Sequence, residues 1–356
     1  MAVTSLSNLY NTLTCGGLIA PSGTNKRKPE NRKLKPENGK MRSSWVAILA
    51  LLVLVGCEKP KPTGGAREIN FASQYSRALI DGDELLRQED IKLFGAYTLD
   101  GRTARIFDAE HLYYNADLPG WDYDNTQYWI AKAQYRFCAV SPYYAPCTFS
   151  DEEGKVVFGN YEATTGGPDL LYATATRDLA VKEDFSTILL NFHHACSAVQ
   201  FNLINASNAT LTNVRNIRLV GLHNRGNFSF DADGNASWAT DGTVVESSSQ
   251  SFGGACTLPN GGLPVNLTVK HSLYDGGALL VLPQTVYKTP VTLHLEYIKA
   301  GDAEYAVRNI ELGYLTGNVP TEWKAGEKYE YNLTITDNTI TTEVKVVDWI
   351  DHYVDL

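Results

Sequence analysis

The chain has 356 residues, with 31 Lys or Arg against 40 Asp or Glu, which gives a net charge of −9 at pH 7. Proteins bind nucleic acids and anionic lipid headgroups through clusters of Lys and Arg, so this acidic balance argues against both kinds of partner. The length is sufficient for two domains that each bury their own core.

A signal peptide is predicted at residues 41–56. Met41 and Arg42 provide a charged start, and Trp45 to Val55 form an uncharged apolar run. The run is shorter than the ~20 apolar residues that a membrane-spanning helix needs, and the pattern is typical of an export signal. It ends at Leu54-Val55-Gly56-Cys57, which resembles the lipobox of bacterial lipoproteins. The resemblance implies that Cys57 is acylated and becomes the mature N-terminus.

The segments on either side of this signal are predicted to lie outside the folded body. Residues 1–40 precede the signal and contain a basic, polar tract, so we expect them to be untranslated or disordered, with Met41 as the true start. Residues 57–68 are rich in Pro, Lys and Gly and should form a tether. Removing residues 1–56 leaves 23 basic against 38 acidic side chains, a net charge near −15. Membrane contact should therefore occur through the lipid alone.

From residue 69 onward the sequence is typical of an all-β protein, with short alternating segments rich in Tyr, Val, Thr and Phe. Ile91–Tyr97 and Gln134–Val140 are predicted as half-buried strands. Between them lies an aromatic cluster that includes Trp121, Tyr123 and Trp129. The cluster either packs under a long loop or stands exposed as a platform that stacks on sugars.

The alternation changes parity in the middle of the chain. Leu190, Phe192, His194 and Cys196 occupy even positions, whereas the later apolar residues occupy odd ones. One extra residue in a strand would produce this switch, so a β-bulge is predicted near residues 195–198. A domain boundary is placed just before this strand, which divides the body into residues 69–184 and 185–356.

The second half continues the β pattern. Asn227–Phe230 and Ala236–Trp238 are predicted to form a hairpin around the Gly-containing turn Asp231–Asn235. Four later strands are predicted at Ala278–Leu282, Val291–Ile298, Tyr329–Ile335 and Glu343–Val347.

No motif indicates catalysis, a cofactor or a metal site, and we predict a protein that is not an enzyme. His193 and His194 would point to opposite faces of a strand and cannot share one ion without distortion. Cys138 and Cys147 flank a short loop that an oxidising compartment could close with a disulfide, although spacing alone does not define thiol geometry.

The ordered set of motifs resembles the fimbrillin-like (Mfa-like) family of Bacteroidetes lipoproteins, the subunits of type V pili. Besides the lipobox at Cys57, the resemblance rests on these segments: Ile69-Asn70-Phe71, Ser76-Arg77-Ala78, Asp81-Gly82-Asp83, Ile91 to Tyr97, Phe137 to Pro142, Asp169 to Ala173, Leu190 to Ser197, Leu280 to Gln284, and Trp323 to Tyr331. It implies two tandem transthyretin-like β-sandwich domains in a surface-exposed outer-membrane lipoprotein of a fimbrium.

The resemblance also implies how the subunit matures. An Arg-specific protease would remove the first strand, Ile69 to Ser73, by cutting after Arg77 or Arg87. The subunit would then join other pilin subunits, its own copies or related chains, by strand exchange and would serve in adhesion to a host or bacterial surface ligand. The basic stretch after Cys57 and the short chain after Trp349 differ from the family pattern and favour a minor, anchor or tip subunit. The alternative is a surface glycan-binding lipoprotein that uses the exposed aromatic cluster.

The C-terminal segment has the alternation that a donor strand needs. Val344, Val346, Ile350, Val354 and Leu356 share one parity, although Asp348 and His352 interrupt the stripe. Residues 343–356 are predicted either to close their own domain or to insert into the groove of a neighbouring subunit.

The lipobox generates the first testable prediction. The variant Cys57→Ser should lose membrane attachment or accumulate as an unprocessed precursor, because it lacks the thiol that is acylated. Cell fractionation combined with mass spectrometry of the N-terminus measures both effects. A Cys57→Ser protein that still fractionates with membranes in a processed form would show that the anchor lies elsewhere.

Overall fold

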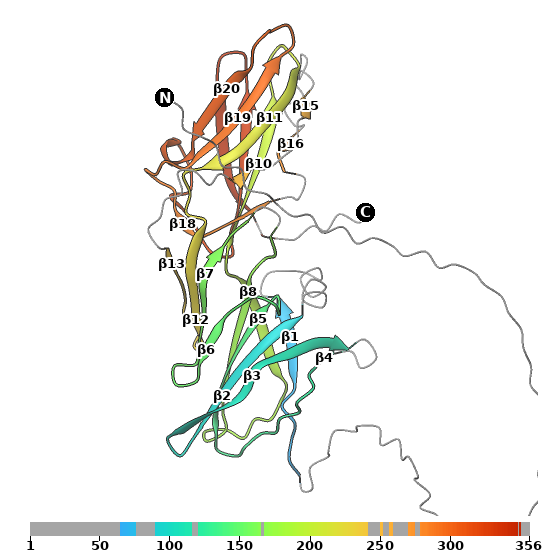
Figure 1. Ribbon diagram of the computed structural model, residues 1–356, viewed down its shortest axis with the longest axis vertical. Helices are drawn as coiled ribbons and strands as arrows, with labels where there is room; N and C mark the ends of the chain where they lie inside the picture. Colours follow the sequence, from blue (N-terminus) through green and yellow to red (C-terminus); the bar gives the residue numbers. More distant parts are fainter. Residues whose placement is uncertain are drawn as a thin grey trace, which may run out of the picture. The chain divides into compact units, whose positions relative to one another are not determined.

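The computed structural model describes residues 65–75, 90–115, 120–164, 167–240, 250–251, 256–258, 270–274, 278–347 and 349 (Figure 1). Within these ranges the chain forms β-strands and one short 3-10 turn, η1 (Leu312–Tyr314). The prediction of an all-β fold is therefore confirmed.

A seven-stranded sheet contains most of the first half of the chain. In spatial order its strands are β1 (Phe71–Tyr75), β9 (Ile188–His194), β8 (Leu171–Asp178), β5 (Gln134–Ser141), β2 (Ile91–Leu99), β3 (Arg102–Asn115) and β4 (Gly120–Asp122). The central strand β5 is buried on both faces, since Tyr135 and Phe137 belong to one core and Cys138 and Val140 to another. The prediction of a half-buried strand at residues 134–140 was wrong because a second sheet covers the other face.

That second, four-stranded sheet has the order β13 (Ala236–Thr240), β12 (Arg225–Asp231), β7 (Lys155–Glu162) and β6 (Thr148–Ser150). Phe158 of β7 and Phe228 of β12 contribute to the core that it shares with the seven-stranded sheet. The predicted hairpin is confirmed, since β12 and β13 pair antiparallel around residues 232–235. This hairpin comes from the second half of the chain, yet it pairs with β7 from the first half. The domain division at residue 184 stays a prediction.

Two five-stranded sheets form the C-terminal sandwich. One contains β16 (His271–Ser272), β10 (Ser197–Asn205), β22 (Lys328–Ile335) and β23 (Ile340–Val347), with β17 (Leu279–Val281) on β10. The other contains β14 (Gln250–Ser251), β11 (Leu211–Val220), β19 (Thr292–Lys299) and β20 (Ala306–Glu311), with β15 (Cys256–Leu258) on β11. Phe201, Leu293 and Tyr331 belong to the shared core. A short pair, β18 (Gln284–Thr285) and β21 (Glu322–Trp323), completes the described strands.

The parity switch after residue 194 marks a change of sheet, so its interpretation as a β-bulge was wrong. β9 ends at His194 and belongs to the seven-stranded sheet, whereas β10 begins at Ser197 and belongs to the C-terminal sandwich. Ala195 and Cys196 lie between the two strands and are buried. β9 and β10 pack into two different cores on either side of this link. The positions that face the core in one strand therefore do not determine which positions face the core in the other.

A glycine in β2 makes room for two of the largest side chains of the first core. Gly95 pairs with Phe107 of β3 and with Phe137 of β5. A Cβ atom at this position would lie 2.9 Å from Cδ2 of Phe107 and 3.1 Å from Cδ1 of Phe137. The two rings therefore approach β2 closely only because residue 95 has no side chain.

Replacing this glycine should disturb the core. We expect Gly95→Ala to lower the free energy of unfolding by about 1–3 kcal/mol, because the added methyl group overpacks the site. Gly159→Ala in β7 is the matched control, since no atom lies within 4 Å of a Cβ there, and it should change stability by less than about 0.5 kcal/mol. Urea denaturation measures both values. Equal losses in the two variants would contradict the packing argument.

Candidate functional site

The first described strand lies at one end of the seven-stranded sheet, and among the described residues it pairs with one strand. β1 pairs with β9 in parallel, with Phe71 opposite Ile188 and Tyr75 opposite Phe192. The other pairings that build this sheet are antiparallel. Parallel pairing is slightly less stable for each residue, and an edge strand is the easiest strand to detach without breaking other ladders.

Side chains from this strand fill an aromatic groove. Ile69, just before β1, is completely buried, and Phe71 is 4% exposed. The ring of Phe71 packs edge to face against Phe107 and Phe137, with centroids 5.6 Å and 5.5 Å away. Tyr123 packs against the same ring at 6.1 Å. We call the residues that receive Ile69 and Phe71 the β1 groove; their side chains come from β3, β5, β9 and the loop at residues 123–129.

Backbone hydrogen bonds join the loop at residues 123–129 to the segment just before β1. The amide of Ile69 donates to the carbonyl of Gln127 at 2.9 Å, and the amide of Trp129 donates to the carbonyl of Arg67 at 2.9 Å. The hydroxyl of Tyr123 donates to the carbonyl of Ile69 at 2.6 Å. Burial raises the pKa of Tyr123 to about 12, so the phenol stays protonated as this donor at neutral pH.

These contacts decide between the two alternatives for the aromatic cluster in favour of packing, and they exclude the exposed platform. Tyr123 is 5% exposed and Trp129 is 8% exposed, and both belong to the first core. Trp121 is half-buried and packs against that core, and its indole N–H donates to the Ser73 hydroxyl at 2.7 Å. The three side chains support β1, so they are not available to stack on sugars.

All three of the predicted processing and anchoring residues lie outside the described part of the chain. These are Cys57, Arg77 and Arg87, of which the two arginines fall in the segment between β1 and β2. The structure therefore does not bear on lipidation or on the cleavage position.

The described part of the predicted donor segment pairs within its own sheet. β23 runs antiparallel to β22, with Val344 opposite Tyr331 and Val346 opposite Tyr329. Val344 packs against the core of the C-terminal sandwich, whereas Val346 is 57% exposed. Ile350, Val354 and Leu356 lie outside the described residues, so donation to a neighbour stays a prediction.

Beyond β23, Trp349 makes a contact that sequence reasoning missed. Trp349 is 6% exposed and stacks on the ring of His194, with centroids 3.8 Å apart and an angle of 8° between the planes. The Nδ1 atom of His194 forms a hydrogen bond with the carboxylate of Asp169. Trp349 lies more than 150 residues away from His194 in the sequence, and no local pattern indicates that they meet.

Cys138 and Cys147 are free thiols in the structure, and a disulfide between them stays a prediction. Cys138 lies in the core between β5 and β7, and its thiol donates to the carbonyl of Gly154 at 3.4 Å. Burial raises the pKa of Cys138 to about 12 and that of Cys147 to about 11.

Within the described ranges, no group of three or more His, Cys, Asp or Glu side chains is arranged to hold a metal ion. No helix among those residues is long and apolar enough to cross a membrane.

Comparison with known proteins agrees with this architecture. The chain aligns with a fimbrial protein from Bacteroides vulgatus with a TM-score of 0.56 and 17% identity, covering 80% of this chain and 99% of the other. It aligns with a candidate cell adhesion protein from Bacteroides ovatus with a TM-score of 0.51 and 15% identity, covering 82% and 100% of the two chains. At these identities the likeness shows a shared fold. No curated protein matches the sequence.

The sequence itself gives a more specific match. The model of the family described as fimbrillin-like matches residues 76–349, which is most of the chain. The matched range begins at Ser76-Arg77-Ala78 and contains the later segments, through Trp323 to Tyr331, on which the resemblance rests. This protein therefore belongs to the fimbrillin-like family.

Proposed function

We propose that the protein is a structural subunit of a cell-surface fimbria and that it assembles by strand exchange after β1 has been removed. The observation that carries this proposal is the arrangement of β1, a parallel edge strand whose buried side chains fill the aromatic β1 groove. Membership of a fimbrial family supports the cellular role. The exchange mechanism, the domain division at residue 184 and the transthyretin-like form of the two domains are parts of the proposal.

Loss of β1 would leave a surface that strongly favours a new strand. Full burial of one large apolar side chain contributes about 1.5–3 kcal/mol, and β1 together with the segment just before it inserts two, Ile69 and Phe71. Its removal would also leave one edge of β9 without its hydrogen-bonding partner. An extended donor with apolar residues at alternate positions satisfies both needs, as in strand addition generally.

We assign the donor role to the C-terminal segment of a neighbouring subunit. That neighbour is either another copy of this chain or a related pilin. Ile350, Val354 and Leu356 continue the parity of Val344 and Val346. In the isolated subunit β23 completes its own sheet and Trp349 stacks on His194, so the segment beyond Trp349 is the part proposed to be donated.

Cleavage and anchoring are linked by their order along the chain. The proposed lipidation site Cys57 precedes β1, whereas the proposed cleavage sites Arg77 and Arg87 follow it. A cut after either arginine would therefore separate the subunit from its lipid and from β1 in one step. A subunit that escapes the cut would keep both, and this is the behaviour expected of an anchor.

The cleavage proposal generates a prediction about two arginines. Treating the purified chain that begins at Cys57 with an Arg-specific protease should yield a new N-terminus at Ala78 or Gln88, followed by polymers. The double variant Arg77→Gln and Arg87→Gln should remain uncut and monomeric, whereas Arg102→Gln, which alters an exposed arginine of β3, should behave like the original protein. Mass spectrometry and electron microscopy provide the two measurements. Polymers formed from the uncut double variant would contradict the proposal.

Deletion of Ile350–Leu356 tests the donor. We expect the shortened subunit to lose polymerisation while the melting temperature of the monomer stays unchanged, because the proposed partner of these residues is another chain. Thermal unfolding of the uncut monomer and electron microscopy of the cut protein separate the two roles. A destabilised monomer that still polymerises would show that the segment belongs to its own subunit.

A further inference from the structure

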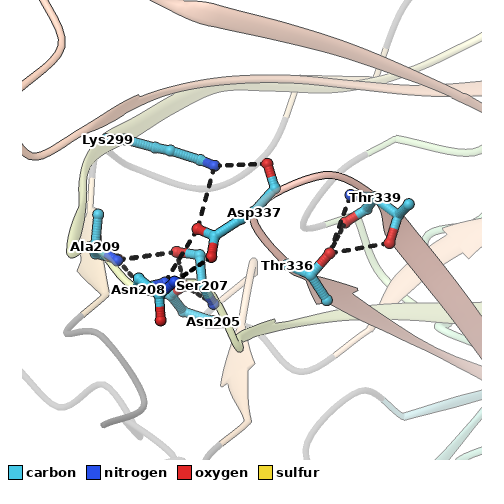
Figure 2. Close-up of polar contacts among 8 residues, drawn as sticks. All are labelled: Asn205, Ser207, Asn208, Ala209, Lys299, Thr336, Asp337 and Thr339. Carbon is cyan, nitrogen blue, oxygen red and sulfur yellow. Dashed lines mark hydrogen bonds and ion pairs between the residues drawn. The ribbon is translucent and has the colours of Figure 1, made fainter.

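The turn between β22 and β23 is tied to the rest of the C-terminal sandwich, so β23 is fixed at its first end (Figure 2). The carboxylate of Asp337 accepts a hydrogen bond from the backbone amide of Asn208 at 3.1 Å. The carbonyl of Asp337 accepts another from Nζ of Lys299, the last residue of β19, at 3.0 Å. Within the turn, the amide of Thr339 donates to the hydroxyl of Thr336 at 3.0 Å. These contacts keep β23 in its own sheet.

Trp349 fixes the chain again just after β23, and it does so beside β9. Its ring stacks on His194, which is the last residue of β9. β1 pairs with the same strand as far as Tyr75, which lies opposite Phe192. Trp349 therefore contacts β9 two residues beyond the last partner of β1, at one end of the strand edge that β1 covers.

The chain beyond Trp349 matches β1 in length and pattern when it is read in the opposite direction. Residues 350–356 and residues 69–75 each span seven positions. A segment that leaves Trp349 and runs antiparallel to β9 would bring Leu356 to the position of Ile69 and Val354 to the position of Phe71. Those are the two positions whose side chains are buried in the β1 groove.

The polar residues of this segment also find suitable places in the same register. Asp355 would take the position of Asn70, which is exposed. His352 would take the position of Ser73, where a ring nitrogen can accept the hydrogen bond that the indole of Trp121 donates to Ser73. An antiparallel ladder is also slightly more stable for each residue than the parallel ladder of β1 and β9.

We propose that residues 350–356, the capping segment, fold back into the β1 groove of their own subunit once β1 has been removed. The inference rests on the proposed function, because it requires that β1 is cut away. The capping segment begins directly after Trp349, and a short tether gives an effective concentration of about millimolar. In dilute protein, capping therefore precedes donation to a neighbour.

The capped subunit is a resting state on the way to the fimbria. The capping segment must leave its own groove before it can enter that of the next subunit. Val354 is smaller than Phe71 and fills less of the space among the aromatic rings, so the cap holds the groove less tightly than β1 does. A better-fitting strand can therefore displace it.

Cysteine cross-linking tests the cap, because Tyr353 takes the position of Ala72 and lies opposite Leu189 in the proposed register. After the cut and removal of β1 at low micromolar concentration, the double variant Leu189→Cys and Tyr353→Cys should form a disulfide within one subunit in most molecules. Directly opposite strand residues have the Cα spacing that a disulfide needs. The uncut double variant should form none, since Ala72 occupies that place. Non-reducing electrophoresis and peptide mass spectrometry identify the link.

Two controls accompany this measurement. The matched pair Asn191→Cys and Asp355→Cys should not cross-link, since the two positions lie four residues apart along the strand, about 13 Å. Deletion of Ile350–Leu356 should lower the melting temperature of the cut monomer by several degrees and leave that of the uncut monomer unchanged. Leu189 is 45% exposed, so its replacement should leave the fold intact, and circular dichroism checks this.

Three outcomes would overturn the proposal: no Leu189 to Tyr353 disulfide in the folded, cut double variant, disulfides between subunits alone, or equal melting of the cut monomers with and without the capping segment. A peptide with the sequence Arg67–Tyr75 separates these failures from a failure of the proposed function. If it still stabilises the cut protein, the groove accepts a strand and only the cap is wrong. If it does not, strand exchange is wrong and the cap falls with it.

Discussion

The insertion of Phe71 among Phe107, Tyr123 and Phe137 is the contact on which the first half of the molecule depends. The groove is supplied by β3, β5 and the loop at residues 123–129, whereas the side chain that fills it comes from an edge strand with one partner. An aromatic groove of this kind is costly to expose to water. The core therefore needs a strand in this position. In the proposed mechanism, a strand from another subunit can replace β1 there.

Much of the fold follows from local patterns. Alternation of apolar and polar residues predicted the β-strands, and the Asp, Gly and Asn residues at 231–235 predicted the hairpin. The parity switch after His194 was misread because an inserted residue and a change of sheet leave the same trace in a sequence. The parallel pairing of β1 with β9 joins segments more than 100 residues apart, and no local signal specifies such a partner.

The candidate site was less accessible to sequence reasoning. The aromatic cluster at residues 121–129 allowed both a buried and an exposed reading, because aromatic side chains serve cores and binding platforms alike. In the structure these residues are buried and form hydrogen bonds to β1 and to the segment just before it.

The most direct test of the account is to remove β1 and then return it as a separate peptide. The protein cut after β1 should melt at a lower temperature than the intact chain, and a peptide with the sequence Arg67–Tyr75 should restore most of the loss. The same peptide carrying Phe71→Ala should restore little, because truncating a buried Phe costs about 3–5 kcal/mol. A cut protein that melts at the same temperature as the intact chain would contradict the claim that the groove requires a strand.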